Sequence, residues 1–451
     1  MLRPIILRVL TIVCAIAAPA LGWSQGGILD VYIRQGIASN HGLKEQHFLL
    51  GKNRLALKEA KRLLMPEVGF GLTYTLAAGG RDIDFPVGDL LNPVYATLNE
   101  QTGTNTFPQI NNEKISFLPN NFYDARLRLQ QPIINRDAHF FKKIKKEEIS
   151  LKEAEIQVFK RDLVKEIKTA YYRYRQAKEA IRIYDNALAL LAENLRVNES
   201  LLRNDKVIPS VLIRVKSEIV NVEAQRNQAI ANAQNAAAFF NFLLNRDLEA
   251  EIEMGEGIVD ADLQFAEGEI NAADKREELL QLGSAQTINA LVLDLKKGYK
   301  VPKVGLQVDV GSQNFDFKYG GYVLAGVSVD VPVWTANRNE LQAQQAALDL
   351  KTIAEKMEDA KNRIALETRT IRNSILAEIE TWRSYKAQKT SAQRQYDDTL
   401  RRYKEGVSNY LELLDARTQL TNVDLQRSLA AFNILIKKAE LERATASYRL
   451  P

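Results

Sequence analysis

The sequence predicts a mostly α-helical chain made of two copies of a helix–β-hairpin–helix repeat, and three observations support this. First, the segment Pro-Glu-Val-Gly-Phe-Gly-Leu at 66–72 returns as Pro-Lys-Val-Gly-Leu-Gln-Val at 302–308. Second, residues 137–203 and 336–404 lack proline and glycine and repeat apolar residues every three or four positions, as long helices do. Third, four segments near the repeated prolines alternate apolar and small or polar residues, the period of β-strands.

The composition disfavours most enzyme classes. The chain has 451 residues, enough for one to three domains, but histidine occurs only at 41, 47 and 139, and Cys14 is the one cysteine. A catalytic thiol, a cysteine zinc site and a disulfide are therefore excluded from any mature chain that begins after residue 14. His41 and His47 are six apart, a poor spacing for a shared metal on a helix. We expect no catalysis, no cofactor and no metal.

The first 24 residues resemble a cleaved secretory signal. Arg3 and Arg8 precede an apolar run of 13 residues from Val9 to Leu21, followed by small residues. A membrane anchor needs about 20 apolar residues, so this run is too short. A lipid anchor on Cys14 is the alternative, but Thr-Ile-Val before it lacks the expected small residue. Removing residues 1–24 leaves 59 basic against 56 acidic residues, too small a surplus to indicate nucleic-acid binding.

The repeat divides the mature chain. The first repeat covers 25–246, an acidic linker covers 247–275, and the second repeat covers 276–451. In the first repeat 66 positions separate Pro66 from Pro132, whereas 30 separate Pro302 from Pro332. The extra 36 residues fall at about 77–121, a stretch rich in Gly, Asn and Pro that we interpret as a long loop.

Four strands are expected, and their length suits a membrane. They cover about 67–76, 123–131, 303–311 and 322–333, and a tilted membrane strand needs about 9–11 residues. Alternation alone equally fits a soluble sheet with one buried face. The predicted export of the chain and the aromatic residues near the strand ends favour membrane strands over a soluble sheet. Four strands cannot close a barrel, so several chains would have to share one.

The remainder of each repeat is expected to be helical. The helices cover about 137–203 and 210–245 in the first repeat, and about 336–404 and 408–447 in the second. A helix of about 67 residues is roughly 100 Å long and must pack against others as a coiled coil. A solvated structural rod is the alternative interpretation.

The residues from Arg402 to Leu420, Arg-Tyr-Lys-Glu-Gly-Val-Ser-Asn-Tyr-Leu-Glu-Leu-Leu-Asp-Ala-Arg-Thr-Gln-Leu, resemble the periplasmic turn of the TolC-like outer-membrane efflux proteins. The duplicated plan extends this resemblance over residues 28–447. The resemblance implies a homotrimer with a twelve-stranded membrane β-barrel and a long α-helical coiled-coil tunnel in the periplasm. The location implied is the outer membrane of a Gram-negative-type bacterium.

The resemblance also implies a gate at the narrow end of the tunnel. Glu412 and Asp415 match the family's two acidic positions there and lie three apart, on one helix face. Tyr403 matches the tyrosine that helps to hold the constriction closed. Glutamate replaces the usual aspartate at 412, and the family's usual arginine after this turn is absent, near Asn409. The alternative for the two acids is a pair of solvated carboxylates near a helix N-terminus.

Contacts with partners are implied at both turns. In the family these turns meet a periplasmic adaptor, which links the channel to an inner-membrane transporter. The matching residues are Val207, Ile208 and Pro209 in the first repeat and Gly406, Val407 and Ser408 in the second. We further expect four charges on the polar faces of the strands to line the lumen of the barrel: Arg126, Arg128, Asp309 and Asp330.

These observations predict a passive exit duct for small toxic compounds, in contact with outer-membrane lipid. Two alternatives stay open. The duct could instead export proteins in a type I system, because the tunnel is shared and the pump chooses the cargo. The chain could also be a soluble periplasmic coiled-coil scaffold whose strands form a soluble sheet.

Overall fold

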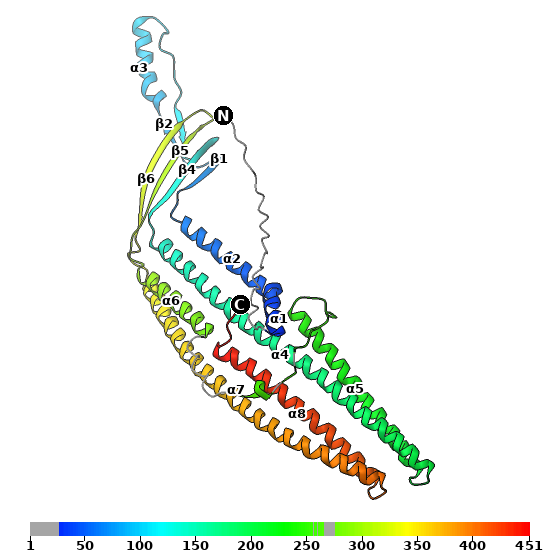
Figure 1. Ribbon diagram of the computed structural model, residues 1–451. Helices are drawn as coiled ribbons and strands as arrows, with labels where there is room; N and C mark the ends of the chain where they lie inside the picture. The colour runs from blue at the N-terminus through cyan, green and yellow to red at the C-terminus, as the bar shows by residue number, and fades with distance from the viewer. Residues whose placement is uncertain (1–26, 256, 259, 266–275) are drawn as a thin grey trace, which may run out of the picture. The chain divides into compact units, whose positions relative to one another are not determined.

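The computed structural model describes residues 27–255, 257–258, 260–265 and 276–451 (Figure 1). The expected signal sequence, residues 1–24, and the end of the acidic linker, residues 266–275, lie outside the described residues. The described chain forms two compact units. The helical unit comprises the described residues of 1–48, 154–280 and 358–451, and the strand unit comprises 49–153 and 281–357.

The strand unit contains a four-stranded antiparallel sheet in the order β1-β4-β5-β6. Its strands are β1 (Glu67–Thr75), β4 (Phe122–Ile134), β5 (Lys303–Phe315) and β6 (Gly321–Asp330). The two repeats meet at the centre, where β4 of the first pairs with β5 of the second. β1 and β6 are the outer strands, so each leaves one edge of the sheet without a strand partner in the described chain.

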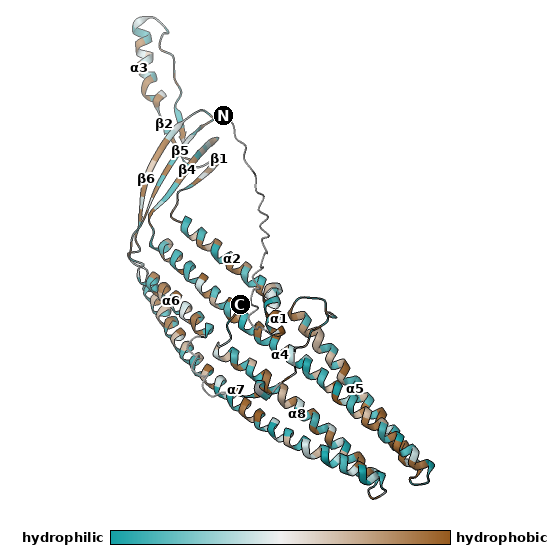
Figure 2. Cartoon of the chain, in the orientation of Figure 1, coloured by the Kyte–Doolittle hydropathy of each residue, from teal (hydrophilic) through white to brown (hydrophobic). Residues whose placement is uncertain are grey.

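The register gives the sheet two chemically different faces. Facing residues in paired strands point to the same side, so Gly71, Arg126 and Gly311 share one face, and Leu72, Ala125 and Ser312 share the other. The first face carries the charged residues of the strands. The second carries a continuous set of apolar side chains that are exposed in the single chain: Val68, Phe70, Leu72, Leu127, Val310, Val323, Val327 and Val329. Hydrophobic residues accordingly run along these strands in Figure 2.

The strand ends differ from those expected, for reasons that lie in the pairing. β5 extends four residues beyond 311 because Phe315 pairs with Phe122 at the start of β4. β4 continues to Ile134 through a shift in register between Pro132 and Ile134. β6 stops at Asp330, opposite the first residue of β5, so residues 331–333 have no strand to pair with. Pro332 also has no N–H to donate.

The expected long loop at 77–121 is largely ordered secondary structure. It contains β2 (Asp82–Phe85), which pairs with β3 (Glu113–Ser116), and between them α3 (Val87–Thr102). Asparagine side chains hold the return segment on α3: Asn92 bonds both the N–H and the C=O of Ile110, and Asn99 does the same with Phe107. The Asn content that suggested a loop therefore stabilises a folded insertion.

The long helices are α4 (Arg136–Arg203) with α5 (Pro209–Leu243), and α7 (Arg338–Lys404) with α8 (Tyr410–Thr445). Shorter helices are α1 (Ile28–Ser39), α2 (His41–Arg62), the 3₁₀ turn η1 (Asp260–Leu263) and α6 (Glu277–Lys297). In the helical unit one apolar core joins α1, α4 and α5 around Ile33, Ile167 and Phe240. Another joins α7 and α8 around Ile375 and Ile434. These contacts follow the apolar spacing along each helix.

No helix in the described part of the chain is both long enough and apolar enough to cross a membrane.

Candidate functional site

The turns that join α4 to α5 and α7 to α8 have the same backbone geometry. Asp205 and Gly406 adopt positive φ angles of 53° and 76°. The next N–H in each turn bonds back to a carbonyl five residues earlier, Lys206 to Leu201 and Val407 to Arg402, both at 2.9 Å. This is the Schellman arrangement that ends a helix, and its left-handed residue is commonly glycine. We call residues 204–208 and 405–409 the two tip turns.

The tip turns place most of the expected partner-contact residues at the surface. Ile208 is 67% exposed and Val407 is 64% exposed, and Pro209 and Gly406 are also exposed. Val207 is half-buried against the apolar residues beneath it. Ser408 is buried, and its hydroxyl donates to a carboxylate oxygen of Glu412, so its side chain faces inward and is not part of this surface. The two exposed aliphatic side chains are the main apolar features of the turns.

Beneath the turns, α4, α5, α7 and α8 pack around one apolar cluster, which we call the tip core. It comprises Val215, Ala392, Tyr396, Tyr403, Tyr410, Leu413, Ala416 and Leu420. A groove beside it opens between α5 and α8, and its lining includes Ile213, Arg214, Glu218, Tyr410 and Leu411. The helices of the two repeats are therefore in direct contact at this end of the helical unit.

Tyr403 links the two repeats within the tip core. Its hydroxyl donates a hydrogen bond to Oδ1 of Asn198 on α4, and Asn198 in turn donates to the carbonyl of Asn194 at 2.7 Å. Tyr403 and Asn198 are both buried. Burial raises the pKa of Tyr403 above its ordinary value, so the hydroxyl stays protonated and remains a donor. The tyrosine singled out from the sequence thus holds α7 to α4.

A second link joins α5 to α8. The guanidinium of Arg417 forms an ion pair with the carboxylate of Glu218, and Arg417 is only 2% exposed. The sequence reasoning missed this pair. The sequence did contain a clue to it, because Arg417 lies on the same face of α8 as the buried residues Leu413, Ala416 and Leu420. A charged residue at such a position requires a buried partner of opposite charge.

Glu412 and Asp415 lie near each other on α8 but in different surroundings. Glu412 bonds to the N-cap residue Asn409 of α8: its N–H donates to Oδ1 of Asn409 at 3.0 Å, while its carboxylate accepts from the side chains of Asn409 and Ser408. Asp415 is exposed, and the described residues offer it no hydrogen bond or ion pair. Asp415 alone therefore presents an uncommitted charge.

The four charges expected in a lumen all lie on the charged face of the sheet. Arg128 makes two hydrogen bonds to Asp309, at 2.8 and 2.7 Å, and Arg126 pairs with Asp124 at 3.0 Å. Asp330 faces Lys303 across the ladder. The structure thus brings Arg128 and Asp309 together and gives Arg126 a partner that was not anticipated.

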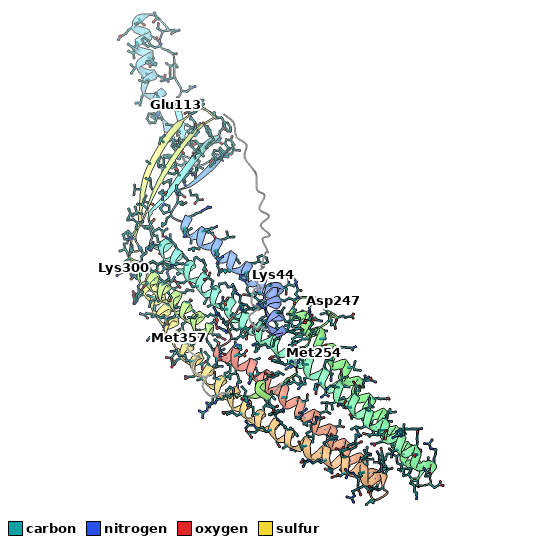
Figure 3. All side chains as sticks on the ribbon, in the orientation of Figure 1. Lys44, Glu113, Asp247, Met254, Lys300 and Met357 are labelled. Atoms are coloured by element: carbon teal, nitrogen blue, oxygen red, sulfur yellow. The ribbon has the colours of Figure 1, made fainter. Side chains whose placement is uncertain are left out.

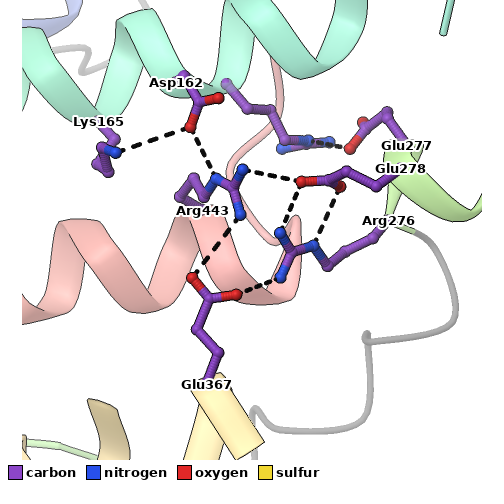
Figure 4. A network of polar contacts seen from close by, with 8 residues as sticks. Asp162, Lys165, Arg276, Glu277, Glu278, Glu367 and Arg443 are labelled. Carbon is purple, nitrogen blue, oxygen red and sulfur yellow. Dashed lines mark hydrogen bonds and ion pairs between the residues drawn. The ribbon is translucent and has the colours of Figure 1, made fainter. Parts of the chain in front are cut away.

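A third cluster of charges lies elsewhere in the helical unit, where α4, α6, α7 and α8 meet (Figure 4). Arg276 pairs with Glu278 and with Glu367, both at 2.6 Å, and Arg443 pairs with Asp162 and with Glu278, both at 2.8 Å. Burial alone would raise the pKa of Glu278, but hydrogen bonds from Arg276 and the charge of Arg443 lower it below its ordinary value. This network joins helices from both repeats.

The described residues contain no group of three or more His, Cys, Asp and Glu side chains placed to hold a metal ion. The arrangement at the tip core is instead one of paired donors and acceptors between helices. These pairs hold helices of the two repeats together.

Known proteins resemble this chain in sequence. Residues 293–447 match the family model for outer membrane efflux proteins. Outer membrane protein TolC of Escherichia coli (strain K12) is 20% identical over 414 residues, which cover 86% of this chain and 76% of TolC.

Solved structures share the fold. The outer membrane protein VceC of Vibrio cholerae aligns with a TM-score of 0.73 at 14% identity, covering 92% of this chain and 95% of VceC. The open state of the MtrE outer membrane channel of Neisseria gonorrhoeae aligns with a TM-score of 0.71 at 16% identity, covering 93% of this chain and 89% of MtrE. With its duplicated helices and its four-stranded sheet, the chain has the fold of these solved outer-membrane channels, and its residues 293–447 are similar to the outer membrane efflux proteins.

Proposed function

We propose that this chain is the outer-membrane exit duct of a tripartite efflux pump and exports small toxic compounds without a catalytic step of its own. The observation that carries the proposal is the sheet of the strand unit. It has one charged face, one exposed apolar face and two edges without strand partners. Such a sheet can place its apolar face against lipid and its charged face against water. It can do so only if strands of other chains pair with its two free edges.

A homotrimer completes it most simply, because three copies of four strands give a twelve-stranded barrel. The apolar face then contacts lipid, and Arg126, Arg128, Asp309 and Asp330 face the lumen. The ion pair of Arg128 with Asp309 partly cancels the charge on that side. The lumen is then lined by paired charges, which suits a passage for varied small compounds.

In the helical unit, the tip turns bind a periplasmic adaptor that connects the duct to an inner-membrane transporter. Exposed Ile208 and Val407 suit the apolar anchors of such an interface. The gate consists of Tyr403, Glu412 and Asp415, with Asp415 supplying the free charge. Adaptor binding would separate the helices and break the buried links of the tip core.

The proposal is tested by export in cells. The chain is deleted from its own bacterium and supplied as the wild type or as the double variant Ile208→Asp and Val407→Asp. We expect the wild type to restore export of small fluorescent dyes and the variant to fail while still reaching the outer membrane as the same oligomer. The matched control, Ile213→Asp, changes an exposed apolar residue of α5 outside the turns and should retain export. Restored secretion of a polypeptide without any dye export would instead assign the chain to a type I protein secretion system.

A further inference from the structure

The four chain segments that connect a long helix to a strand of the sheet are rich in basic residues. All four lie at one end of the sheet, because Glu67 pairs with Gln130, Lys303 with Asp330 and Val304 with Ile134. The stretches 58–67, 136–146, 294–303 and 330–340 contain 13 basic and 6 acidic residues, a surplus of seven. The whole chain has a surplus of only five, so positive charge is concentrated here.

Ten of these basic side chains are exposed, and we call all of them but Lys58 the basic collar: Lys61, Arg62, Lys142, Lys143, Lys146, Lys297, Lys300, Lys303 and Arg338. They come from the ends of α2 and α6, the starts of α4 and α7, and the link before β5. Figure 3 labels Lys300 where the strands of the strand unit give way to its helices.

Most of the collar charge is not neutralised within the chain. Lys303 pairs with Asp137 at 2.5 Å, while Lys143 lies 5.3 Å from the ring of Phe140 and Lys300 lies 5.7 Å from the ring of Tyr299. The other six form no ion pair with any described residue. A neighbouring hollow is lined by Arg136 and Lys296, but these already bond the carbonyl of Asp294 and the side chain of Gln342. The uncompensated charge is therefore carried by exposed side chains.

Apolar and aromatic side chains are exposed at the same level. Trp334 is 84% exposed, and Ile133, Phe141 and Val333 are exposed as well. They lie in the same stretches of chain as the collar residues or directly beside them. Lysine and arginine beside exposed tryptophan is the chemistry of a membrane–water interface, where the ring lies at the headgroups and the cation reaches the phosphates. A nucleic acid or an acidic protein would not require this apolar border.

We propose that the basic collar binds the phosphates of anionic phospholipids in the leaflet on the helix side of the sheet. The inference rests on the proposed function, because it requires that the strands cross a bilayer. Juxtamembrane cations attract anionic lipids, and several together retain them against exchange with neutral lipids. The collar would then fix the depth of the sheet in the membrane and select the lipids around it.

Trp334 reports this binding directly. The full chain is reconstituted in phosphatidylcholine vesicles that contain an equal small fraction of brominated phosphatidylglycerol or brominated phosphatidylcholine. Bromine quenches nearby tryptophan, and a Trp334→Phe sample provides the signal of the other tryptophans for subtraction. We expect stronger quenching of Trp334 by the anionic lipid, corresponding to a preference of about tenfold or more that falls as salt is added.

Variants identify the residues responsible. Changing Lys142, Lys143, Lys297 and Lys300 to Gln should remove the preference, while changing the same four to Arg should keep it. A matched control removes four exposed lysines elsewhere, Lys44, Lys216, Lys351 and Lys356, and should also keep it. Equal quenching by both lipids in the wild type, or a preference that survives in the collar variant, overturns the collar alone. No quenching by either lipid means that the sheet is not in the bilayer and overturns the proposed function as well.

Discussion

Arg417 on α8 is buried against Glu218 on α5 and is held there by an ion pair between the two repeats. The pair lies next to Asp415, the free acid of the proposed gate, and beside the groove between α5 and α8. A cation that joins the repeats is therefore present inside the core, about two helical turns along α8 from Asn409.

This pair gives the first prediction. Glu218→Ala leaves the guanidinium of Arg417 buried without its partner, and should lower the free energy of unfolding by about 3 kcal/mol. The double variant Glu218→Leu with Arg417→Met removes both charges and should be less destabilised than the single variant. Thermal unfolding of both proteins in detergent measures this. Equal or greater destabilisation in the double variant would contradict a coupled pair.

Tyr403 gives the second prediction. Tyr403→Phe leaves Oδ1 of buried Asn198 without its donor and should cost about 1–3 kcal/mol, with a higher closed-state conductance in planar bilayers. Tyr410→Phe is the matched control, because the Tyr410 hydroxyl is also buried but has no hydrogen-bond partner among the described residues. Removing that hydroxyl should be nearly neutral. Similar effects of the two variants would argue against a closing role for Tyr403.

The two acids of α8 should respond differently to substitution. Asp415→Asn should reduce the cation preference of the channel with little change in stability, because its carboxylate has no partner in the described chain. Glu412→Ala should cost about 1 kcal/mol of stability, because it removes the carboxylate that accepts hydrogen bonds from Ser408 and Asn409. The double alanine variant should raise the closed-state conductance and reduce cation preference. Unaltered conductance and selectivity in that protein would remove both acids from the gate.

The charged face of the sheet gives a fourth prediction. Replacing Arg126 and Arg128 with Gln leaves Asp124 and Asp309 without their basic partners. If that face lines the lumen, the channel should become more cation-selective, which the reversal potential in a salt gradient measures. The control Lys300→Gln also removes a positive charge, but at the collar, and should have a smaller effect. An unchanged reversal potential in the arginine variant would place these charges outside the conducting path.

The network around Glu278 predicts a pH dependence. Its pKa is lowered in the folded chain, so the stability that it contributes is complete above its unfolded value of about 4.5. That contribution is lost as the pH falls through the lower folded value. In the variant Glu278→Gln, the free energy of unfolding should therefore fall less between pH 6 and pH 3 than in the wild type. Circular dichroism of the helices, followed during unfolding at each pH, measures this. Parallel curves for wild type and variant would contradict the assignment.

Periodicity was sufficient to predict the long helices and the four strands, because both are amphipathic and repeat over many residues. The ends of the strands were harder to predict, since they depend on pairing partners hundreds of residues away, as for Phe122 with Phe315. The insertion at 77–121 was misjudged because Asn92 and Asn99, residues typical of loops, bond to backbone groups across that segment.

At the candidate site, the sequence pointed to Tyr403, Glu412 and Asp415 but not to the buried polar residues that link the helices. Asn198, Glu218 and Arg417 lie on three different helices and meet only through packing. Polar residues in the buried register of a helix were the available signal, and they indicate that a partner exists without identifying it. The capping of α8 by Asn409 depends only on its local spacing from Glu412, so the sequence alone could have predicted it.

The central claim is that the sheet of one chain is completed by other copies within a membrane. The most direct test is the mass of the particle extracted from membranes with detergent, corrected for the bound detergent. We expect three chains and release only with detergent. A monomer or dimer recovered without detergent would contradict the account, because the exposed apolar face would then belong to a soluble periplasmic scaffold.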